Sequence, residues 1–188
     1  VFGTGVHDPR SERKFNLEKI RRIMEINFFG TMNSINSVYD YFKDIANFLS
    51  QYDYVIGNLE APFVDKGKKY GAKSAHIKSD IKNVDLLNFL NINVVNLANN
   101  HIYDYGKDGY LTTLNLLDKN NISYFGVEEK EDILSKGSNK VALNGYCGYS
   151  SNPLGVYSGK GCGVNELSIE KLEKVLKNNH EQGIFNIF

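Results

Sequence analysis

The sequence has few cysteines, no excess of either charge and no long apolar run. Cys147 and Cys162 are its only cysteines, which is too few to hold 188 residues together, and they are too far apart for a Cys-x-x-Cys site. Lysine plus arginine and aspartate plus glutamate number 22 each, so no net charge favours binding to nucleic acid or to an anionic membrane. No run of about 18 apolar residues is present, and we expect no membrane span.

The first ten residues have neither the basic start nor the apolar stretch of a secretory signal peptide. A cytoplasmic location is therefore the default expectation. The two cysteines flank a loop rich in glycine, serine and asparagine, where a disulfide and a pair of reduced thiols both fit. Reduced thiols agree with the expected location, and we predict them.

The alternation of apolar and polar segments predicts an α/β fold. Residues 1–23 hold a glycine-rich turn and a short charged helix that do not fit the rest, and we interpret them as an extension of unclear origin. Residues 24–188 then form one domain. Strands are expected at 25–30, 53–57, 92–97, 122–125, 139–146 and 184–188, and helices at 34–50, 84–90, 109–120 and 168–179. Repeated strand–helix–strand units predict parallel pairing, and because the last strand ends the sequence, we expect an incomplete unit.

Polar residues follow the second expected strand as Asn58-Leu-Glu60. Residues two apart at a strand end project from the same side. Their amide and carboxylate oxygens suit Mg²⁺, Mn²⁺ or Zn²⁺. The alternative is an ordinary turn, because Gly57-Asn58 is typical of turns and Glu60 precedes Ala-Pro.

The third expected strand runs into Asn96-Leu-Ala-Asn-Asn-His-Ile-Tyr-Asp-Tyr-Gly106. Open α/β sheets place ligand sites at the carboxyl ends of their strands, so Asn100 and His101 are candidate site residues. Asp104 lies three residues on, where a carboxylate can orient an imidazole. Alternatively Asn99 or Asn100 caps the turn, and Asp104 is the N-cap of the next helix.

The segment between residues 60 and 79 contains several lysines. They form either a basic lid over a phosphate or polyanion or a solvated loop. His76 and Lys78 are the candidate substrate-binding residues in this segment.

Gly57-Asn-Leu-Glu-Ala-Pro62 and the segment from Asn96 to Gly106 resemble the CapA family of capsule (poly-γ-glutamate) synthesis proteins. This family belongs to the calcineurin-like metallophosphoesterase superfamily. The resemblance extends from about Met24 to the end of the sequence and includes the helix and strand that end at Gly126. It implies two facing β-sheets flanked by helices, with the site at the strand ends.

The resemblance also implies roles for individual residues. Asn58, Glu60 and Asn100 would be metal ligands, for one or, in complete relatives, two divalent ions. His101 would contact the scissile phosphate and its leaving oxygen, and Asp104 would orient His101. The implied partners are a cell-surface polymer or its phosphorylated precursor, and other capsule-synthesis proteins.

Two departures from the family pattern predict a weak or inactive enzyme. The first strand ends Phe29-Gly30-Thr31 where the family has Gly-Asp, and a neutral hydroxyl replaces a carboxylate poorly as a metal ligand. The later histidine motif of the family would follow Phe188, where the sequence ends. The alternative function is a non-catalytic assembly or polymer-binding protein that keeps the fold.

Overall fold

The computed structural model describes residues 35–130, 132–148, 154–157, 159 and 161–188. Residues 43–188 form one compact unit. Helix α2 (Ile35–Leu49), which crosses the boundary of that unit, matches the helix expected at 34–50. The extension expected at 1–23 and the strand expected at 25–30 lie outside the described residues.

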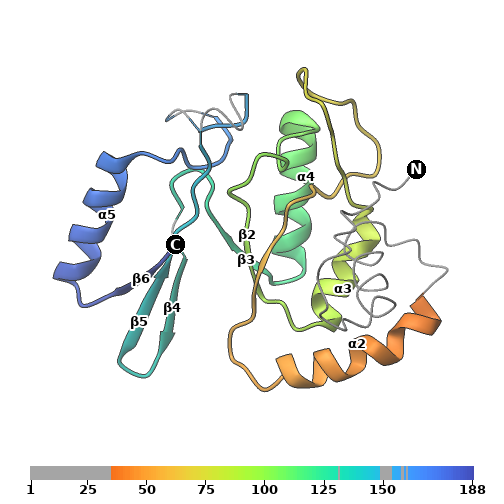
Figure 1. The fold of residues 1–188 in the computed structure, drawn as a ribbon, viewed down its shortest axis with the longest axis horizontal. Helices are drawn as coiled ribbons and strands as arrows, with labels where there is room; N and C mark the ends of the chain where they lie inside the picture. Colours follow the sequence, from red (N-terminus) through yellow and green to blue (C-terminus); the bar gives the residue numbers. More distant parts are fainter. Residues whose placement is uncertain (1–34, 131, 149–153, 158, 160) are drawn as a thin grey trace, which may run out of the picture. The chain divides into compact units, whose positions relative to one another are not determined.

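The first sheet contains three parallel strands in the order β1-β2-β3. They are β1 (Ile56–Asn58), β2 (Val94–Asn96) and β3 (Ser123–Phe125). Of these strands, β2 and β3 are labelled in Figure 1. The connections contain the 3-10 turn η2 (Ile81–Asn83), helix α3 (Val84–Phe89) and helix α4 (Gly106–Lys119). Parallel pairing through helical crossovers agrees with the prediction, although β1 begins later than expected and ends one residue beyond, at Asn58.

The second sheet has the order β4-β5-β6. Its strands are β4 (Asp132–Lys136), β5 (Asn139–Leu143) and β6 (Phe185–Ile187), and helix α5 (Ile169–Glu181) connects the last two. β5 and β6 pair in parallel, as the crossover requires. β4 was not predicted, and it pairs antiparallel with β5 across a two-residue turn, Gly137-Ser138.

The two sheets pack together through apolar side chains. Val94 of β2, Phe125 of β3 and Leu143 of β5 form one buried cluster. A larger cluster lies under α4 and includes Phe63, Leu97, Ile102, Tyr110 and Leu117. The fold is therefore α/β with two sheets and flanking helices, as the sequence predicts.

The inward face of α4 differs from the expected one at one position. Helical spacing in the sequence predicts that Leu111, Leu114 and Leu117 face inward. Leu114 and Leu117 are buried, but Leu111 is exposed. Tyr110 and Thr113 are fully buried instead. Because successive helical residues are rotated by about 100°, Leu111 lies to the side of the stripe that these residues form.

Two residues after the last residue of each of the helices α3, α4 and α5, the chain has a positive φ angle. These residues are Asn91 (φ 55°), Asn121 (φ 56°) and Gly183 (φ 67°). After α4, Ile122 N–H donates to the Leu117 carbonyl and Asn121 N–H to the Asp118 carbonyl, which is the Schellman arrangement. Asparagine and glycine tolerate this left-handed conformation, so local sequence fixes the helix ends.

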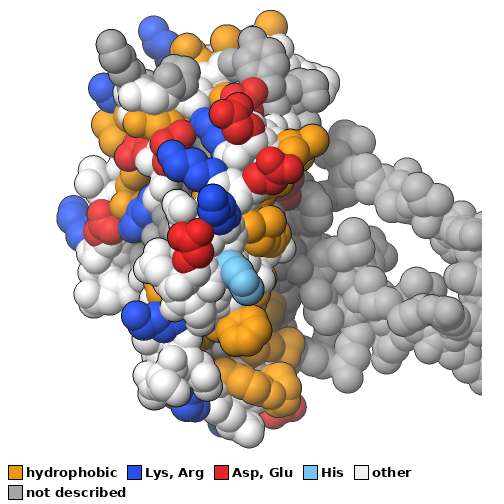
Figure 2. Space-filling model, turned by 90° about the vertical axis from the view of Figure 1, so that its left-hand side faces the viewer, with side chains coloured by type: hydrophobic (Ala, Val, Ile, Leu, Met, Phe, Trp, Pro, Cys, Tyr) orange, Lys and Arg blue, Asp and Glu red, His pale blue; other side chains and the backbone are white. Residues whose placement is uncertain are grey.

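The side of the molecule on which α5 lies carries basic and acidic side chains intermixed, with no large area of one charge (Figure 2). This agrees with the balanced composition. Cys147 and Cys162 are both free thiols. Among the described residues, no helix is long and apolar enough to cross a membrane.

Candidate functional site

The two polar motifs meet at the carboxyl ends of β1 and β2. Asn58 and Asn96 are paired in the parallel register, and the Asn96 side-chain amide donates to Asn58 Oδ1 over 3.3 Å. One residue further, Leu59 N–H donates to the Asn96 carbonyl over 3.0 Å, and the Asn99 side-chain amide donates to the Leu59 carbonyl over 2.9 Å. The strand register thus brings both predicted motifs into one place.

The turn after β2 is closed by Asn99. Its Oδ1 accepts hydrogen bonds from the backbone N–H groups of His101 (3.0 Å) and Ile102 (2.9 Å). Of the capping asparagines that the sequence left open, the structure selects Asn99 for this role. The backbone carbonyl of Asn100 accepts a hydrogen bond from the Lys73 ammonium.

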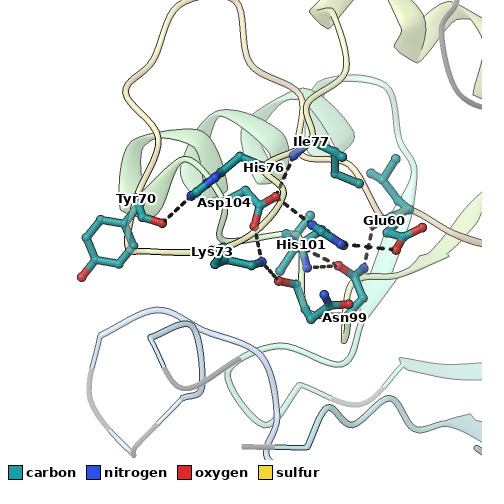
Figure 3. Close-up of polar contacts among 11 residues, drawn as sticks. Glu60, Tyr70, Lys73, His76, Ile77, Asn99, His101 and Asp104 are labelled. Atoms are coloured by element: carbon teal, nitrogen blue, oxygen red, sulfur yellow. Dashed lines mark hydrogen bonds and ion pairs between the residues drawn. The ribbon is translucent and has the colours of Figure 1, made fainter. Parts of the chain in front are cut away.

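The His101 imidazole lies between two carboxylates (Figure 3). Its Nδ1 is 2.8 Å from Asp104 Oδ2, and its Nε2 is 3.9 Å from Glu60 Oε1. The Asp104 side chain is fully buried, whereas 15% of the His101 side chain and 51% of the Glu60 side chain are exposed. His101 therefore presents Nε2 to the half-exposed Glu60 carboxylate, and Asp104 holds the ring from the protein interior.

Asp104 has the orienting arrangement rather than the N-cap role. The N-cap position of α4 is Tyr105, and no side chain caps this helix end. The Asp104 carboxylate instead accepts from His101, from the backbone N–H of Ile77 (2.8 Å) and from Lys73. These contacts compensate the free-energy cost of burying the carboxylate, which is large when a buried charge has no partners.

The loop from residue 60 to residue 79 folds back onto the turn that carries His101. Tyr70 N–H donates to the Asp104 carbonyl over 2.8 Å, and the Lys73 ammonium contacts both the Asn100 carbonyl and Asp104 Oδ1. No local sequence pattern distinguishes Lys73 from the other lysines of the loop. The residues that it contacts, Asn100 and Asp104, lie 27 and 31 positions away in the sequence.

The two candidate substrate-binding residues take part in the structure of the same loop. His76 Nε2 lies 3.0 Å from the Tyr70 carbonyl (Figure 3). The Lys78 ammonium donates to the Asp65 carbonyl over 3.1 Å and lies 5.9 Å from the centre of the Tyr105 ring. His76 directly precedes Ile77, whose N–H binds Asp104, so it lies beside the site. Their contact with a substrate stays a prediction.

The Asn96 side chain is closely surrounded at the strand end. Its Oδ1 accepts from the Ala98 N–H over 3.0 Å. Gly126 and Gly145 lie so close that a Cβ atom would come within 2.8 Å and 2.3 Å of this oxygen, respectively. Only glycine therefore fits at either position without displacing the Asn96 amide.

Charged groups that could bind a metal ion are few in the described part of the site. In residues 35–188, the masked positions apart, no three His, Cys, Asp or Glu side chains are close enough to hold an ion. Glu60 and His101 contribute one carboxylate and one imidazole, and the third charged group, Asp104, is occupied by Lys73, His101 and Ile77. The end of the expected first strand, Thr31, lies outside the described residues.

Burial perturbs two groups near this part of the core. Burial raises the pKa of the Cys147 thiol, and the positive charge of Lys73 opposes that rise. Burial also raises the pKa of Tyr110 well above its ordinary value, and the neighbouring Glu128 carboxylate, which accepts from the tyrosine hydroxyl over 3.1 Å, adds to the rise. Both groups are therefore uncharged at neutral pH.

Two packed sheets with flanking helices, and polar side chains at the carboxyl ends of the parallel strands, make this an α/β protein with a metallophosphoesterase-like fold. The sequence model of the bacterial capsule synthesis protein PGA_cap matches residues 13–179, and the chain belongs to this family.

Two curated proteins are similar to the chain. The PGA biosynthesis protein CapA of Bacillus subtilis (strain 168) is 35% identical over 112 residues, which cover 58% of this chain and 29% of that protein. The capsule biosynthesis protein CapA of Bacillus anthracis is 32% identical over 114 residues, covering 58% of this chain and 26% of that protein. The chain thus matches less than a third of the length of either relative.

Proposed function

We propose that the chain serves the synthesis of a capsule or another cell-surface polymer, with a polar site at His101 that acts on a phosphorylated precursor. The observation that supports this most is the His101 ring, which is held by a buried carboxylate at Nδ1 and faces the half-exposed Glu60 carboxylate at Nε2. The names of the two relatives support the biosynthetic context.

The geometry suits a proton transfer at Nε2. The Asp104 carboxylate stabilises a positive charge on the ring, so His101 can take up a proton at Nε2 and donate it from there to an oxygen that leaves phosphorus. Glu60 lies 3.9 Å from the same nitrogen and stabilises the same charge. His76 and Lys78 are the basic residues that we propose for contact with the phosphate group.

A phosphate close to Glu60 would meet a like charge unless a cation lay between them. This supports binding of Mn²⁺, Mg²⁺ or Zn²⁺, for which Asn58, Glu60 and Asn100 are the proposed ligands. Further ligands would have to come from residues outside the described ranges, because the described ones are too few. The proton transfer above is therefore assigned to His101 and Asp104 alone, and we propose that any hydrolytic activity is weak.

Hydrolysis of an aryl phosphate in the presence of added Mn²⁺ tests the proposal. The parent protein is compared with His101→Ala, and His180→Ala serves as the matched control because His180 is an exposed residue in the last turn of α5. We expect hydrolysis that is lost in His101→Ala and kept in His180→Ala. Equal activity in all three proteins would contradict a role of His101.

The second candidate function is a non-catalytic assembly or polymer-binding protein. The small number of charged ligands in the described part of the site favours it, as does Thr31 in place of the family's aspartate. Absence of hydrolysis at every Mn²⁺ concentration would support this function. Binding of poly-γ-glutamate by the same protein, measured by calorimetry, would then be its positive test.

A further inference from the structure

Lys73 contacts both Asp104, which holds the His101 ring, and the backbone next to His101 (Figure 3). Its ammonium donates to Asp104 Oδ1 and to the backbone carbonyl of Asn100, the residue directly before His101. The Lys73 side chain is 23% exposed and the Asp104 side chain is fully buried. The lysine therefore places a positive charge against a carboxylate that water does not reach.

The two oxygens of Asp104 have different partners. Oδ1 accepts from Lys73, whereas Oδ2 accepts from the Ile77 N–H and from His101 Nδ1, each over 2.8 Å. Because its two oxygens already accept from Lys73 and from the Ile77 N–H, the Asp104 carboxylate acts as an acceptor toward His101 as well.

The tautomer of His101 follows from this. Because Asp104 accepts at Oδ2, the proton of the neutral imidazole must be on Nδ1, and the lone pair of the ring is on Nε2. Nε2 is the ring nitrogen that faces Glu60. The contact of Lys73 with the Asn100 carbonyl also fixes the backbone that carries the ring.

We infer that Lys73 is a positioning residue for His101, and that it acts through Asp104 and the Asn100 carbonyl to hold the imidazole in the Nδ1–H tautomer with Nε2 toward the site. The catalytic importance of this role rests on the proposed function of His101. The contacts of Lys73 themselves do not depend on that function. It assigns to the basic loop a role in organising the site, beyond contact with substrate. Lys78 differs from Lys73 because it binds the Asp65 carbonyl of its own loop.

The ring nitrogens of His101 report the tautomer directly in ¹⁵N nuclear magnetic resonance spectra. We expect the metal-free parent protein to show a single tautomer, protonated at Nδ1. In Lys73→Met, which keeps length but removes the charge, we expect this single tautomer to be lost and the shifts of the two nitrogens to converge. Lys73→Arg should restore the parent pattern in part, and Lys69→Met, at an exposed position of the same loop, should leave it unchanged.

Several results would overturn the inference. A parent protein protonated at Nε2 would do so without any variant, as would a folded Lys73→Met protein with the parent tautomer. If Lys73→Met does not fold, Lys73→Gln keeps one donor for the Asn100 carbonyl and takes its place in the comparison. If the parent hydrolyses aryl phosphate, Lys73→Met should lower kcat about 10–100-fold with little change in KM.

The outcomes separate this inference from the proposed function. A Lys73-dependent tautomer in a protein without hydrolytic activity would leave the positioning role standing and contradict the phosphoesterase. Hydrolysis that depends on His101 with a tautomer indifferent to Lys73 would contradict the positioning role alone.

Discussion

The Asn96 side-chain amide donates to Asn58 Oδ1 over 3.3 Å, although the two residues are 38 positions apart in the sequence. They are register partners at the ends of two parallel strands. Any polar motif that follows β1 must therefore lie beside the motif that follows β2. Because of this relationship, Glu60 and His101 share one site.

Thr113 of α4 holds the beginning of the loop that carries Lys73 by a hydrogen bond to Phe63. The Thr113 hydroxyl is fully buried, accepts from Phe63 N–H over 2.9 Å and donates to the Gly109 carbonyl. Thr113→Val leaves the Phe63 N–H without a partner and should lower the free energy of unfolding by about 1–3 kcal/mol. Urea unfolding measures this free energy. Thr112→Val, on the exposed side of the same helix, should change the free energy of unfolding by less than about 0.5 kcal/mol. Equal losses in the two variants would contradict a stabilising role of the Thr113–Phe63 hydrogen bond.

Gly145 should tolerate no side chain. In Gly145→Ala the new Cβ would lie 2.3 Å from Asn96 Oδ1 and 3.0 Å from the Gly126 backbone. We expect a loss of about 1–3 kcal/mol in unfolding free energy, as for an overpacked core, and displaced amide resonances at Asn58 and Asn96. Gly137→Asn is the control, because nothing lies within 4 Å there and asparagine tolerates its φ of 60°. A stable Gly145→Ala protein with parent resonances would refute the close approach.

Asp132 should make stability depend on pH. Its Oδ2 is buried without a hydrogen-bond partner in the described structure, and burial raises its pKa. Below the ordinary carboxyl pKa of about 3.9, Asp132 is protonated in both the folded and the unfolded state and does not change the free energy of unfolding. As the pH rises through the raised pKa of the folded state, the free energy of unfolding falls.

Asp132→Asn should therefore gain stability relative to the parent as pH rises from 3 to 7, measured by thermal unfolding across that range. Asp44→Asn, at an exposed position of α2, is the control and should show no such trend. A constant difference between Asp132→Asn and the parent at all pH values would show that the carboxylate is not destabilising.

Metal binding should respond to position 31 more than to the basic loop. Thr31→Asp adds a charged hard oxygen where the expected first strand ends, and we expect tighter binding of Mn²⁺ or Zn²⁺ in calorimetry. Lys68→Ala should leave metal affinity nearly unchanged, because exposed charges are screened beyond about 10 Å at ordinary salt. Unaltered binding by Thr31→Asp would mean that position 31 does not face the site.

Much of the fold could be predicted because it depends on local periodicity. The ends of α3, α4 and α5 follow from residues that tolerate positive φ, and the expected strand–helix alternation gives the parallel first sheet. β4 was missed because its sequence, Asp-Ile-Leu-Ser-Lys, has no alternation of apolar and polar residues. The strand exists through its hairpin with β5. Leu111 was predicted to face inward but is exposed, because the successive rotations of about 100° per residue place it to the side of the buried stripe.

The sequence by itself determined that polar motifs stand at two strand ends, since parallel strands meet at one edge of a sheet whatever their connections. It left open whether Asp104 caps a helix or holds His101, because both roles suit an aspartate three residues after a histidine. Tertiary structure decided this by folding the loop between residues 60 and 79 onto the turn, where Lys73 and the Ile77 N–H compensate the buried carboxylate. Contacts between residues about 30 positions apart depend on the path of the whole loop, and no local spacing encodes that path.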